Sequence, residues 1–241
     1  EIRLSLVGSE MCIRDRTMKT RFLAICVALL GLCGCRSGNA INEWANYADT
    51  RIGVIDTRAN NCVIGPRLPY GSIYPSPQTP NGGMDGYHPN FPIRGFGQLH
   101  VSGTGWGAYG HFLVSPQVGT LVADTAGHDS PHSGDVTRPY YYSTFLDRYQ
   151  TQVEIAPAHY SAMYRFTFPK SEEAGVLFDA SQAIPTDIER NMNGKVLESS
   201  AQIDMETGKM RMKITYRGGW VNGPYSLYMV CLLYTSPSPR D

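Results

Sequence analysis

The chain has 241 residues, in which 21 Lys and Arg residues balance 21 Asp and Glu residues. This balance lacks the basic surplus that is expected of a nucleic-acid-binding protein. The 25 glycines, 16 prolines and 15 tyrosines favour strands and shaped loops over helices. We expect an all-β protein that is long enough to bury a sizeable core, in one large domain or two small ones.

Both ends of the chain read as translated sequencing adapter. Residues 9–16 (S-E-M-C-I-R-D-R) and 231–241 (C-L-L-Y-T-S-P-S-P-R-D) back-translate to DNA strings that are reverse complements over the end sequence of transposon-based library adapters. Unrelated protein termini do not encode complementary strands by chance. We therefore expect residues 1–17 and 231–241 to be read-through that belongs outside the fold, with the gene starting at Met18 and lacking its 3′ end.

An export signal follows Met18. The basic start M-K-T-R and the apolar run over 22–32 are typical of a signal peptide, and the run is too short for a membrane-spanning helix of about 20 residues. The sequence L-C-G-C, which ends at Cys35, is similar to a bacterial lipobox. We expect residues 18–35 to be a lipoprotein signal peptide, with an ordinary signal peptide cleaved near residues 38–40 as the alternative.

The segments after the signal peptide predict where the protein resides. Residues 36–46 are expected to be a linker and residues 47–230 the folded part. A lipid at Cys35 predicts an exported protein anchored to a membrane, in the periplasm or at the cell surface. Cys62 is the one cysteine left in the folded part, so we expect no internal disulfide and interpret Cys62 as a small buried residue.

Three segments between residues 63 and 138 are dominated by turn and loop signals. Repeated prolines exclude a helix over 63–78 and leave room only for short strands such as 71–74. The run N-G-G-M-D-G-Y-H-P-N at 81–90 is a dense turn signal and a candidate ligand loop. Over 124–138 a metal site and a solvated loop are the alternatives, and we favour the loop because the spacing fits no ligand template. The residues concerned there are His128, Asp129, His132 and Asp135.

From residue 140 onward, alternation of apolar and polar residues predicts strands. Residues 175–178 are expected to form a buried strand, and 203–205 and 210–216 a hairpin around the turn at 206–208. Two stacked antiparallel sheets about 10 Å apart make the expected fold a two-sheet antiparallel β-sandwich. The residues predicted to point inward are Ala162, Tyr164, Phe166, Phe168, Met210, Met212, Ile214 and Tyr216.

The most informative stretch is residues 95–116, G-F-G-Q-L-H-V-S-G-T-G-W-G-A-Y-G-H-F-L-V-S-P. Glycines alternate there with side chains that bond or stack, which indicates a backbone shaped around a ligand. A bulged turn that binds nothing is the alternative reading. The flanks 98–101 and 111–115 are expected to be short strands.

This stretch resembles the signature G-F-S-H-T-H-L-S-G-T-G of glycoside hydrolase family 92, the calcium-dependent exo-α-mannosidases. Residues 61–79 are similar to the family's F-P-G-A-T-x-P-F-G-M-V-Q-L-S-P-D-T, and residues 141–169 to its Y-Y-S-V-x-L-x-x-Y-x-V-x-A-E-L-T-A-T-x-R-x-x-x-H-R-Y-T-F-P. V-L-F-D-A-S-Q-A-I, which starts at residue 176, completes four matches in the same order. Within the family, the chain most resembles the α-1,2-mannosidases. The resemblance implies that residues 47–230 are the family's N-terminal β-sandwich in truncated form.

The resemblance also implies a reaction. The family packs this sandwich against a helical (α/α)6 domain that carries a glutamate general acid, an aspartate general base and Ca²⁺. Its members are exo-acting α-mannosidases that invert configuration, with the two carboxyl groups roughly 6.5 to 9.5 Å apart. Because this chain ends before that domain, we expect it to hold no catalytic residue and no metal ligand and to be inactive by itself. The expected partners are a mannose-containing glycan, the missing (α/α)6 domain and a membrane.

In the family the sandwich forms one wall of the substrate pocket. A sugar presents hydroxyls along its rim and C–H faces, so its recognition needs hydrogen-bonding side chains beside aromatic rings. His100 is assigned to the pocket, whereas Ser102 and Thr104 are equally suited to hydrogen bonds that fix the loop itself. Position by position, the resemblance implies the substrate-binding residues Asp85, Tyr87, His88, His100, Ser102, Gly103, Thr104 and Gly105. Trp106 follows the matched signature, and we expect it to supply a replacement stacking face.

Four positions depart from the family pattern. Gln98 replaces the first histidine of the signature, and Met84 stands where α-1,2-mannosidases of the family carry a tryptophan. Ala108 and His111 stand where the family has two aspartates. These departures leave the linkage specificity open and keep a second class of function in view, namely a non-catalytic glycan-binding lipoprotein.

Replacement of Cys35 tests the predicted anchor. Without the acceptor thiol no acyl chain attaches, so Cys35→Ala is expected to move the protein from the membrane pellet to the soluble fraction on cell fractionation. Ser37→Ala, two residues away, is the control and is expected to stay in the pellet. Retention of Cys35→Ala in the membrane would contradict the lipoprotein prediction.

Overall fold

The chain divides into two compact units, residues 9–47 and residues 1–8 with 48–241. In the first unit the short 3-10 helix η1 (Glu43–Tyr47) brings the rings of Trp44 and Tyr47 to 6.1 Å. In the part of the chain that is described, no helix is long and apolar enough to cross a bilayer. The predicted signal peptide, Cys35 included, lies outside that part. The computed structural model describes residues 2–6, 43–54, 62–80, 86–101, 109–124, 127–184, 194–219 and 221–235.

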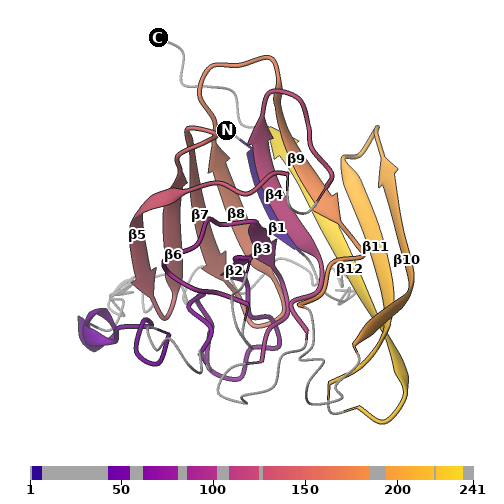
Figure 1. The fold of residues 1–241 in the computed structure, drawn as a ribbon, viewed down its shortest axis with the longest axis horizontal. Helices are drawn as coiled ribbons and strands as arrows, with labels where there is room; N and C mark the ends of the chain where they lie inside the picture. Colours follow the sequence, from indigo (N-terminus) through magenta and orange to yellow (C-terminus); the bar gives the residue numbers. More distant parts are fainter. Residues whose placement is uncertain are drawn as a thin grey trace, which may run out of the picture. The chain divides into compact units, whose positions relative to one another are not determined.

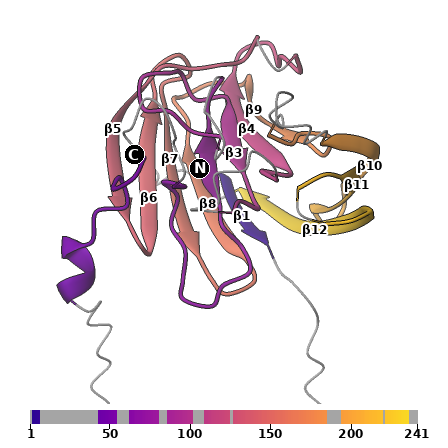
Figure 2. The same ribbon diagram turned by 60° about the horizontal axis from the view of Figure 1, so that its bottom comes forward.

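The second unit contains two antiparallel sheets (Figure 1). Eight strands form the larger sheet in the order β10-β11-β12-β1-β8-β7-β6-β5, and four form the smaller sheet in the order β2-β3-β4-β9. Figure 2 shows the smaller sheet lying over one face of the larger. The predicted two-sheet antiparallel β-sandwich is confirmed. The strands are β1 (Ile2–Leu6), β2 (Ser76–Gln78), β3 (Gly95–Gly97), β4 (Leu113–Val118), β5 (His132–Arg138), β6 (Tyr141–Leu146), β7 (Thr151–Pro157), β8 (Ala162–Thr167), β9 (Ala174–Asp179), β10 (Lys195–Asp204), β11 (Lys209–Arg217) and β12 (Pro224–Thr235).

The two segments expected to lie outside the fold take part in the larger sheet. β1 pairs with the end of β12, from Ile2 opposite Thr235 to Leu6 opposite Cys231, and its other edge pairs with β8. Main-chain hydrogen bonds form this ladder, and every residue other than proline carries the donor and acceptor that it needs. The pairing therefore does not bear on the origin of these segments, which stays a prediction.

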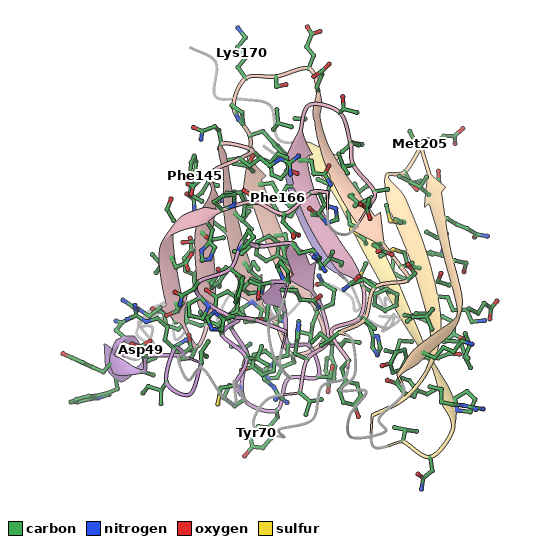
Figure 3. All side chains as sticks on the ribbon, viewed as in Figure 1. Asp49, Tyr70, Phe145, Phe166, Lys170 and Met205 are labelled. Atoms are coloured by element: carbon green, nitrogen blue, oxygen red, sulfur yellow. The ribbon has the colours of Figure 1, made fainter. Side chains whose placement is uncertain are left out.

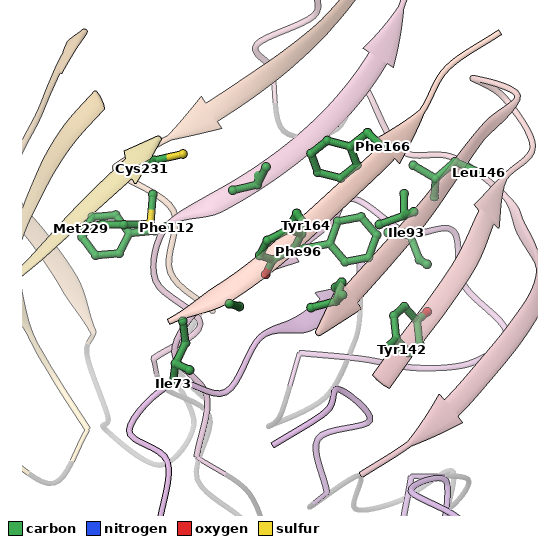
Figure 4. Packing of buried hydrophobic residues seen from close by; sticks show 14 of the residues in the cluster. Ile73, Ile93, Phe96, Phe112, Tyr142, Leu146, Tyr164, Phe166, Met229 and Cys231 are labelled. Carbon is green, nitrogen blue, oxygen red and sulfur yellow. The ribbon is translucent and has the colours of Figure 1, made fainter. Parts of the chain in front are cut away.

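Buried aromatic and aliphatic side chains fill the space between the sheets (Figure 4). β8 buries Ala162, Tyr164 and Phe166, as its alternation predicts, and the ring of Phe96 from β3 lies 6.4 Å from that of Tyr164. In Figure 3, Phe166 lies among the strands, whereas Met205 lies at the periphery and is 81% exposed. Period-two patterning thus determined which face of β8 meets the smaller sheet.

The predicted hairpin is confirmed as β10 and β11. Its turn is held by the carboxylate of Asp204, which accepts hydrogen bonds from the main-chain N–H groups of Glu206 and Thr207 at 3.0 and 3.2 Å. The left-handed position of the turn is taken by Gly208, with φ of 64°. The alternating residues of β11 are buried as predicted, namely Met210, Met212, Ile214 and Tyr216.

Two of the strand predictions before residue 120 are wrong. Residues 71–74 do not form a strand, because their N–H groups bond to loop carbonyls; Ser72, for example, donates to His159 at 2.7 Å. The strand begins only at Ser76. Residues 98–101 are likewise not a strand, and a single bridge joins Leu99 to His111.

The loop predicted over 124–138 is wrong for its second half, which forms β5. β5 is the outermost strand of the larger sheet, so one of its edges has no neighbouring strand, and its sequence of polar residues and glycine imitates a loop. A register shift between Ser133 and Val136, with Gly134 at φ of 66°, adds to that likeness. Edge position also explains why β9, predicted to be buried, is only half-buried. Cys62 is half-buried too, and not fully buried as predicted.

Candidate functional site

The candidate site is built around the buried side-chain amide of Gln78, the last residue of β2. Gln78 is 3% exposed, and its Nε2 donates to the carbonyl of Gly110 at 2.7 Å. The same nitrogen lies 3.3 Å from Nε2 of His100, and Oε1 accepts from Gln182 at 3.4 Å. We refer to Gln78, His100, Gly110 and Gln182 as the amide cluster. It joins two positions of the glycine-rich stretch, His100 and Gly110, to the residues that follow β9.

His100 of the amide cluster is held in one neutral form. Its Nδ1 lies 2.8 Å from the carbonyl of Tyr74, so Nδ1 carries the proton and Nε2 accepts from Gln78. Burial lowers the pKa of His100 to about 4, against a smaller opposite effect of the bond to Tyr74. Both ring nitrogens are thus engaged inside the protein. The assignment of His100 to a sugar contact stays a prediction, and the geometry also gives this residue a part in shaping the loop.

The backbone beside the amide cluster adopts an unusual conformation. Tyr109 and Phe112 have φ of 78° and 61°, a left-handed region that costs residues with a Cβ of order 1–3 kcal/mol each. The main chain is held there by hydrogen bonds from Gln98 to His111 at 2.9 Å and from Ile184 to Tyr109 at 2.8 Å. Strained backbone of this kind persists only where the surroundings fix it, and it is concentrated at functional sites.

Gln98 and His111, two of the residues that depart from the family pattern, are buried and form hydrogen bonds to the larger sheet. Gln98 accepts a hydrogen bond from the hydroxyl of Tyr164 at 2.9 Å. His111 lies 3.1 Å from the hydroxyl of Tyr225, and its ring packs edge-on at 4.7 Å against Tyr216. Burial, and secondly the nearby His100, lower the pKa of His111 to about 4. Both side chains connect the glycine-rich stretch to the core.

The second predicted ligand loop ends beside the amide cluster. The carbonyl of Gly86 accepts from the N–H of Thr79, which follows Gln78, at 2.8 Å. His88 is half-buried, and its main-chain N–H donates to the hydroxyl of Thr79 at 3.0 Å. The chain that follows Gly86 is therefore fixed to the end of β2.

Tyr87 points away from the amide cluster. It is 1% exposed, and its hydroxyl lies 3.5 Å from Asp135, which also accepts from His132 at 3.1 Å. Burial first, and the charge of Asp135 second, raise the pKa of Tyr87. Tyr87 thus bonds this loop to β5, whereas His100 bonds to β2. The remaining predicted site residues lie outside the described part of the chain, namely Asp85, Ser102, Gly103, Thr104, Gly105 and Trp106.

Sequence reasoning did not identify Gln78, Gln182 or Tyr225 as parts of this region. Gln78 and Gln182 are 104 residues apart, and His111 and Tyr225 are 114 apart. No local spacing signals such contacts. Gln78 in the stretch I-Y-P-S-P-Q-T, which is predicted to contain short strands, was the one available hint, because a buried glutamine needs partners.

The described residues do not provide a site for Ca²⁺. Calcium takes six to eight oxygen ligands, mostly carboxylates and carbonyls. Among the residues that the structure describes, no group of three or more His, Cys, Asp or Glu side chains is arranged to hold a metal. We therefore assign no step in this chain to the ion.

Comparison with protein families identifies the chain. Residues 47–238 match the glycosyl hydrolase family 92 N-terminal domain. The chain belongs to glycosyl hydrolase family 92. The resemblance seen in the sequence is thereby confirmed, and the two sheets are those of a family 92 N-terminal domain.

Solved family 92 structures share the fold. The α-mannosidase BT3965 from Bacteroides thetaiotaomicron, alone and in complex with mannoimidazole, aligns with a TM-score of 0.64 and 20% identity over 80% of this chain. The inverting mannosidase BT2199 of the same organism aligns with a TM-score of 0.55 and 20% identity over 78%. This chain spans 30% and 28% of the lengths of those proteins. No curated protein matches the sequence.

Acid is expected to destabilise the domain through its two neutral histidines. Unfolded histidine titrates near pH 6.5, whereas His100 and His111 in the fold do so near 4. Between these values the unfolded state binds more protons, so their contribution is complete above pH 6.5 and is lost as pH falls towards 4. Each histidine accounts for up to about 3 kcal/mol of that loss.

Urea unfolding at pH 7.5 and 4.5 measures this dependence. His100→Gln is expected to flatten the decrease in unfolding free energy between the two pH values by up to about 3 kcal/mol. His159→Gln, the same substitution at an exposed position, is the control. An unaltered slope in His100→Gln would show that this histidine is not buried in neutral form.

Proposed function

We propose that this chain is the N-terminal, carbohydrate-binding sandwich of an exo-acting α-mannosidase that hydrolyses α-linked mannose from glycans with inversion. The observation that carries the proposal is the amide cluster, which holds the glycine-rich stretch at His100 and Gly110, beside left-handed backbone at Tyr109 and Phe112. A stretch that is rich in glycine, held at two points and strained beside one of them is suited to presenting side chains to a ligand. Membership of family 92 makes an α-mannoside the ligand of choice.

The binding residues follow from sugar chemistry. Trp106 supplies an apolar face for the C–H side of a mannose ring, and the polar groups at Asp85, Ser102 and Thr104 supply partners for its hydroxyls. His88, half-buried after the neighbouring turn, is the member of the described loop that faces a ligand in this proposal. Tyr87 acts by fixing that loop to Asp135 at 3.5 Å.

Hydrolysis belongs to the longer protein. We place the glutamate acid, the aspartate base and Ca²⁺ in a helical (α/α)6 domain that this chain does not contain, so the chain alone binds but does not cleave. An inverting reaction needs room for a water molecule between one carboxylate and the sugar, hence a separation of roughly 6.5 to 9.5 Å between the carboxyl groups. The similar structures of the α-mannosidase BT3965 and the inverting mannosidase BT2199 support this reaction class.

Export completes the proposal. We propose that the lipid at Cys35 anchors the protein to a bacterial membrane, in the periplasm or at the cell surface, where glycans are met outside the cytoplasm. The polar residues 36–46 then separate the anchor from the sandwich.

A second function, a glycan-binding lipoprotein without activity, is favoured by the replacements at 98 and 111. Gln98 and His111 are buried and bonded to Tyr164 and Tyr225, so they act in the scaffold and supply no acidic group to a site. The gene sequence beyond the codon for Val230 separates the two functions. We expect it to encode a helical domain with both carboxylates, whose protein cleaves α-mannosides when calcium is present. A stop codon soon after Val230, or loss of either carboxylate, would leave the binding function alone.

Trp106 provides the test of binding by this chain. Trp106→Ala is expected to weaken binding of an α-linked mannan by about tenfold or more, as measured by affinity electrophoresis, because one stacking face is lost. Phe112→Ala is the control: Phe112 is 1% exposed, so its effect, once corrected for stability, is expected to be smaller. Equal losses in the two variants would remove Trp106 from the site.

A further inference from the structure

Three stretches of the chain meet at one side chain. Gln78 ends β2, His100 and Gly110 lie on either side of residues 101–109 within the glycine-rich stretch, and Gln182 follows β9. The bonds from Gln78 to these residues measure 3.3, 2.7 and 3.4 Å. They span 22, 32 and 104 residues of sequence.

The amide of Gln78 engages both its donors and its oxygen with these stretches. A side-chain amide carries two N–H donors and one carbonyl acceptor. One N–H of Gln78 is directed to Gly110, the other to Nε2 of His100, and the oxygen accepts from Gln182. Gln78 is 3% exposed, so a partner that moves away leaves a buried polar group unsatisfied, at a cost of about 1–3 kcal/mol. The positions of the three partners are therefore coupled.

Glycines make room for this amide. A Cβ on Gly97 would overlap Nε2 of Gln78, and a Cβ on Gly110 would lie 2.5 Å from the same atom. Ile184 closes the other side, where Cδ1 would lie 2.6 Å from a Cβ on Gly86. The backbone thus approaches Gln78 more closely than any residue with a side chain permits.

The bond to Gly110 also falls where the backbone is most strained. Gly110 has φ of 65° and lies next to Tyr109, whose φ is 78°. The N–H of Gly110 donates to Leu99 at 2.5 Å, while its carbonyl accepts from Gln78, so both sides of this peptide segment are fixed. Removal of the Gln78 donor would release the carbonyl of Gly110 and with it one of the hydrogen bonds that hold the left-handed conformation.

We propose that Gln78 is a positioning residue for the glycan site: its amide sets His100 and Gly110 of the glycine-rich stretch and the residues after β9 in the one arrangement that binds an α-mannoside. The ligand named here rests on the proposed function. The positioning itself rests only on the contacts of Gln78. No contact between Gln78 and the sugar is part of the proposal.

The substitution Gln78→Glu is nearly isosteric and removes the donors. At neutral pH a carboxylate oxygen would face the carbonyl of Gly110 and the lone pair of His100 Nε2, and both contacts would become repulsive. Acidification restores a donor, either by protonating the carboxyl group or by protonating His100, which is the titratable group in contact with the amide. A loss that acid reverses is therefore specific to this geometry, and a misfolded variant would not recover.

Gln117→Glu is the matched control. Gln117 lies in β4, is 0% exposed, and its amide bonds both the N–H and the carbonyl of Val122, at 2.8 and 3.0 Å. This substitution has the same chemistry at equal burial, but it acts on a turn at the other end of β4.

The experiment compares the 241-residue chain with both variants at pH 7.5 and pH 5. Hydrogen exchange by NMR follows the N–H groups of Gln98 and Gly110, and affinity electrophoresis follows binding of an α-linked mannan. At pH 7.5, both N–H groups are expected to exchange with solvent about tenfold faster in Gln78→Glu than in the unsubstituted chain. The variant is also expected to bind mannan about tenfold more weakly. At pH 5 both ratios should return to within about threefold, and Gln117→Glu should match the unsubstituted chain throughout.

The two readouts separate the possible failures. Unchanged exchange and unchanged binding in Gln78→Glu would overturn the positioning role, as would equal effects in Gln117→Glu. If the unsubstituted chain does not bind mannan, the proposed function fails, and hydrogen exchange still decides whether Gln78 fixes these segments. Faster exchange with unchanged mannan binding would show that the arrangement does not serve the glycan site, and would also overturn the proposal.

Discussion

A buried side-chain amide has to satisfy two donors and one acceptor without help from water, and in this domain that constraint falls on Gln78. Its partners are His100, Gly110 and Gln182, which come from three separate stretches of chain. Apolar packing is tolerant of small shifts, whereas hydrogen bonds lose their value over fractions of an ångström. The amide therefore imposes a sharper geometry on this region than the surrounding hydrophobic core does.

Contacts with the larger sheet stabilise the arrangement of residues around Gln78. Gln98 follows β3, and its side chain accepts from Tyr164 of the larger sheet at 2.9 Å, beside the packed rings of Phe96 and Tyr164. His111 reaches the same sheet through Tyr225. Gln98 and His111 thus bond the glycine-rich stretch to the larger sheet. These contacts stabilise the strained backbone at Tyr109 and Phe112.

The candidate site was predictable only in part. The order of motifs located the glycine-rich stretch and named His100, because a short signature survives in sequence. The sequence did not reveal that both nitrogens of His100 are engaged, or that Tyr87 bonds to Asp135, because each partner comes from a distant element. The prediction of a loop around His132, where the structure has the edge strand β5, failed for a related reason. Local composition cannot distinguish a solvated loop from a strand with one bare edge.

The sequence by itself determined the all-β class, the inward faces of β8 and β11, the hairpin turn at Gly208 and the family. These features depend on alternation, turn chemistry and ordered motifs, which are local properties of the chain. Only the tertiary structure decided where the strands around residues 71–101 begin and end, and that Gln78, His100 and Gln182 meet. Those outcomes depend on contacts between residues up to 104 positions apart, where the packing of two sheets selects the partners and no local pattern records the choice.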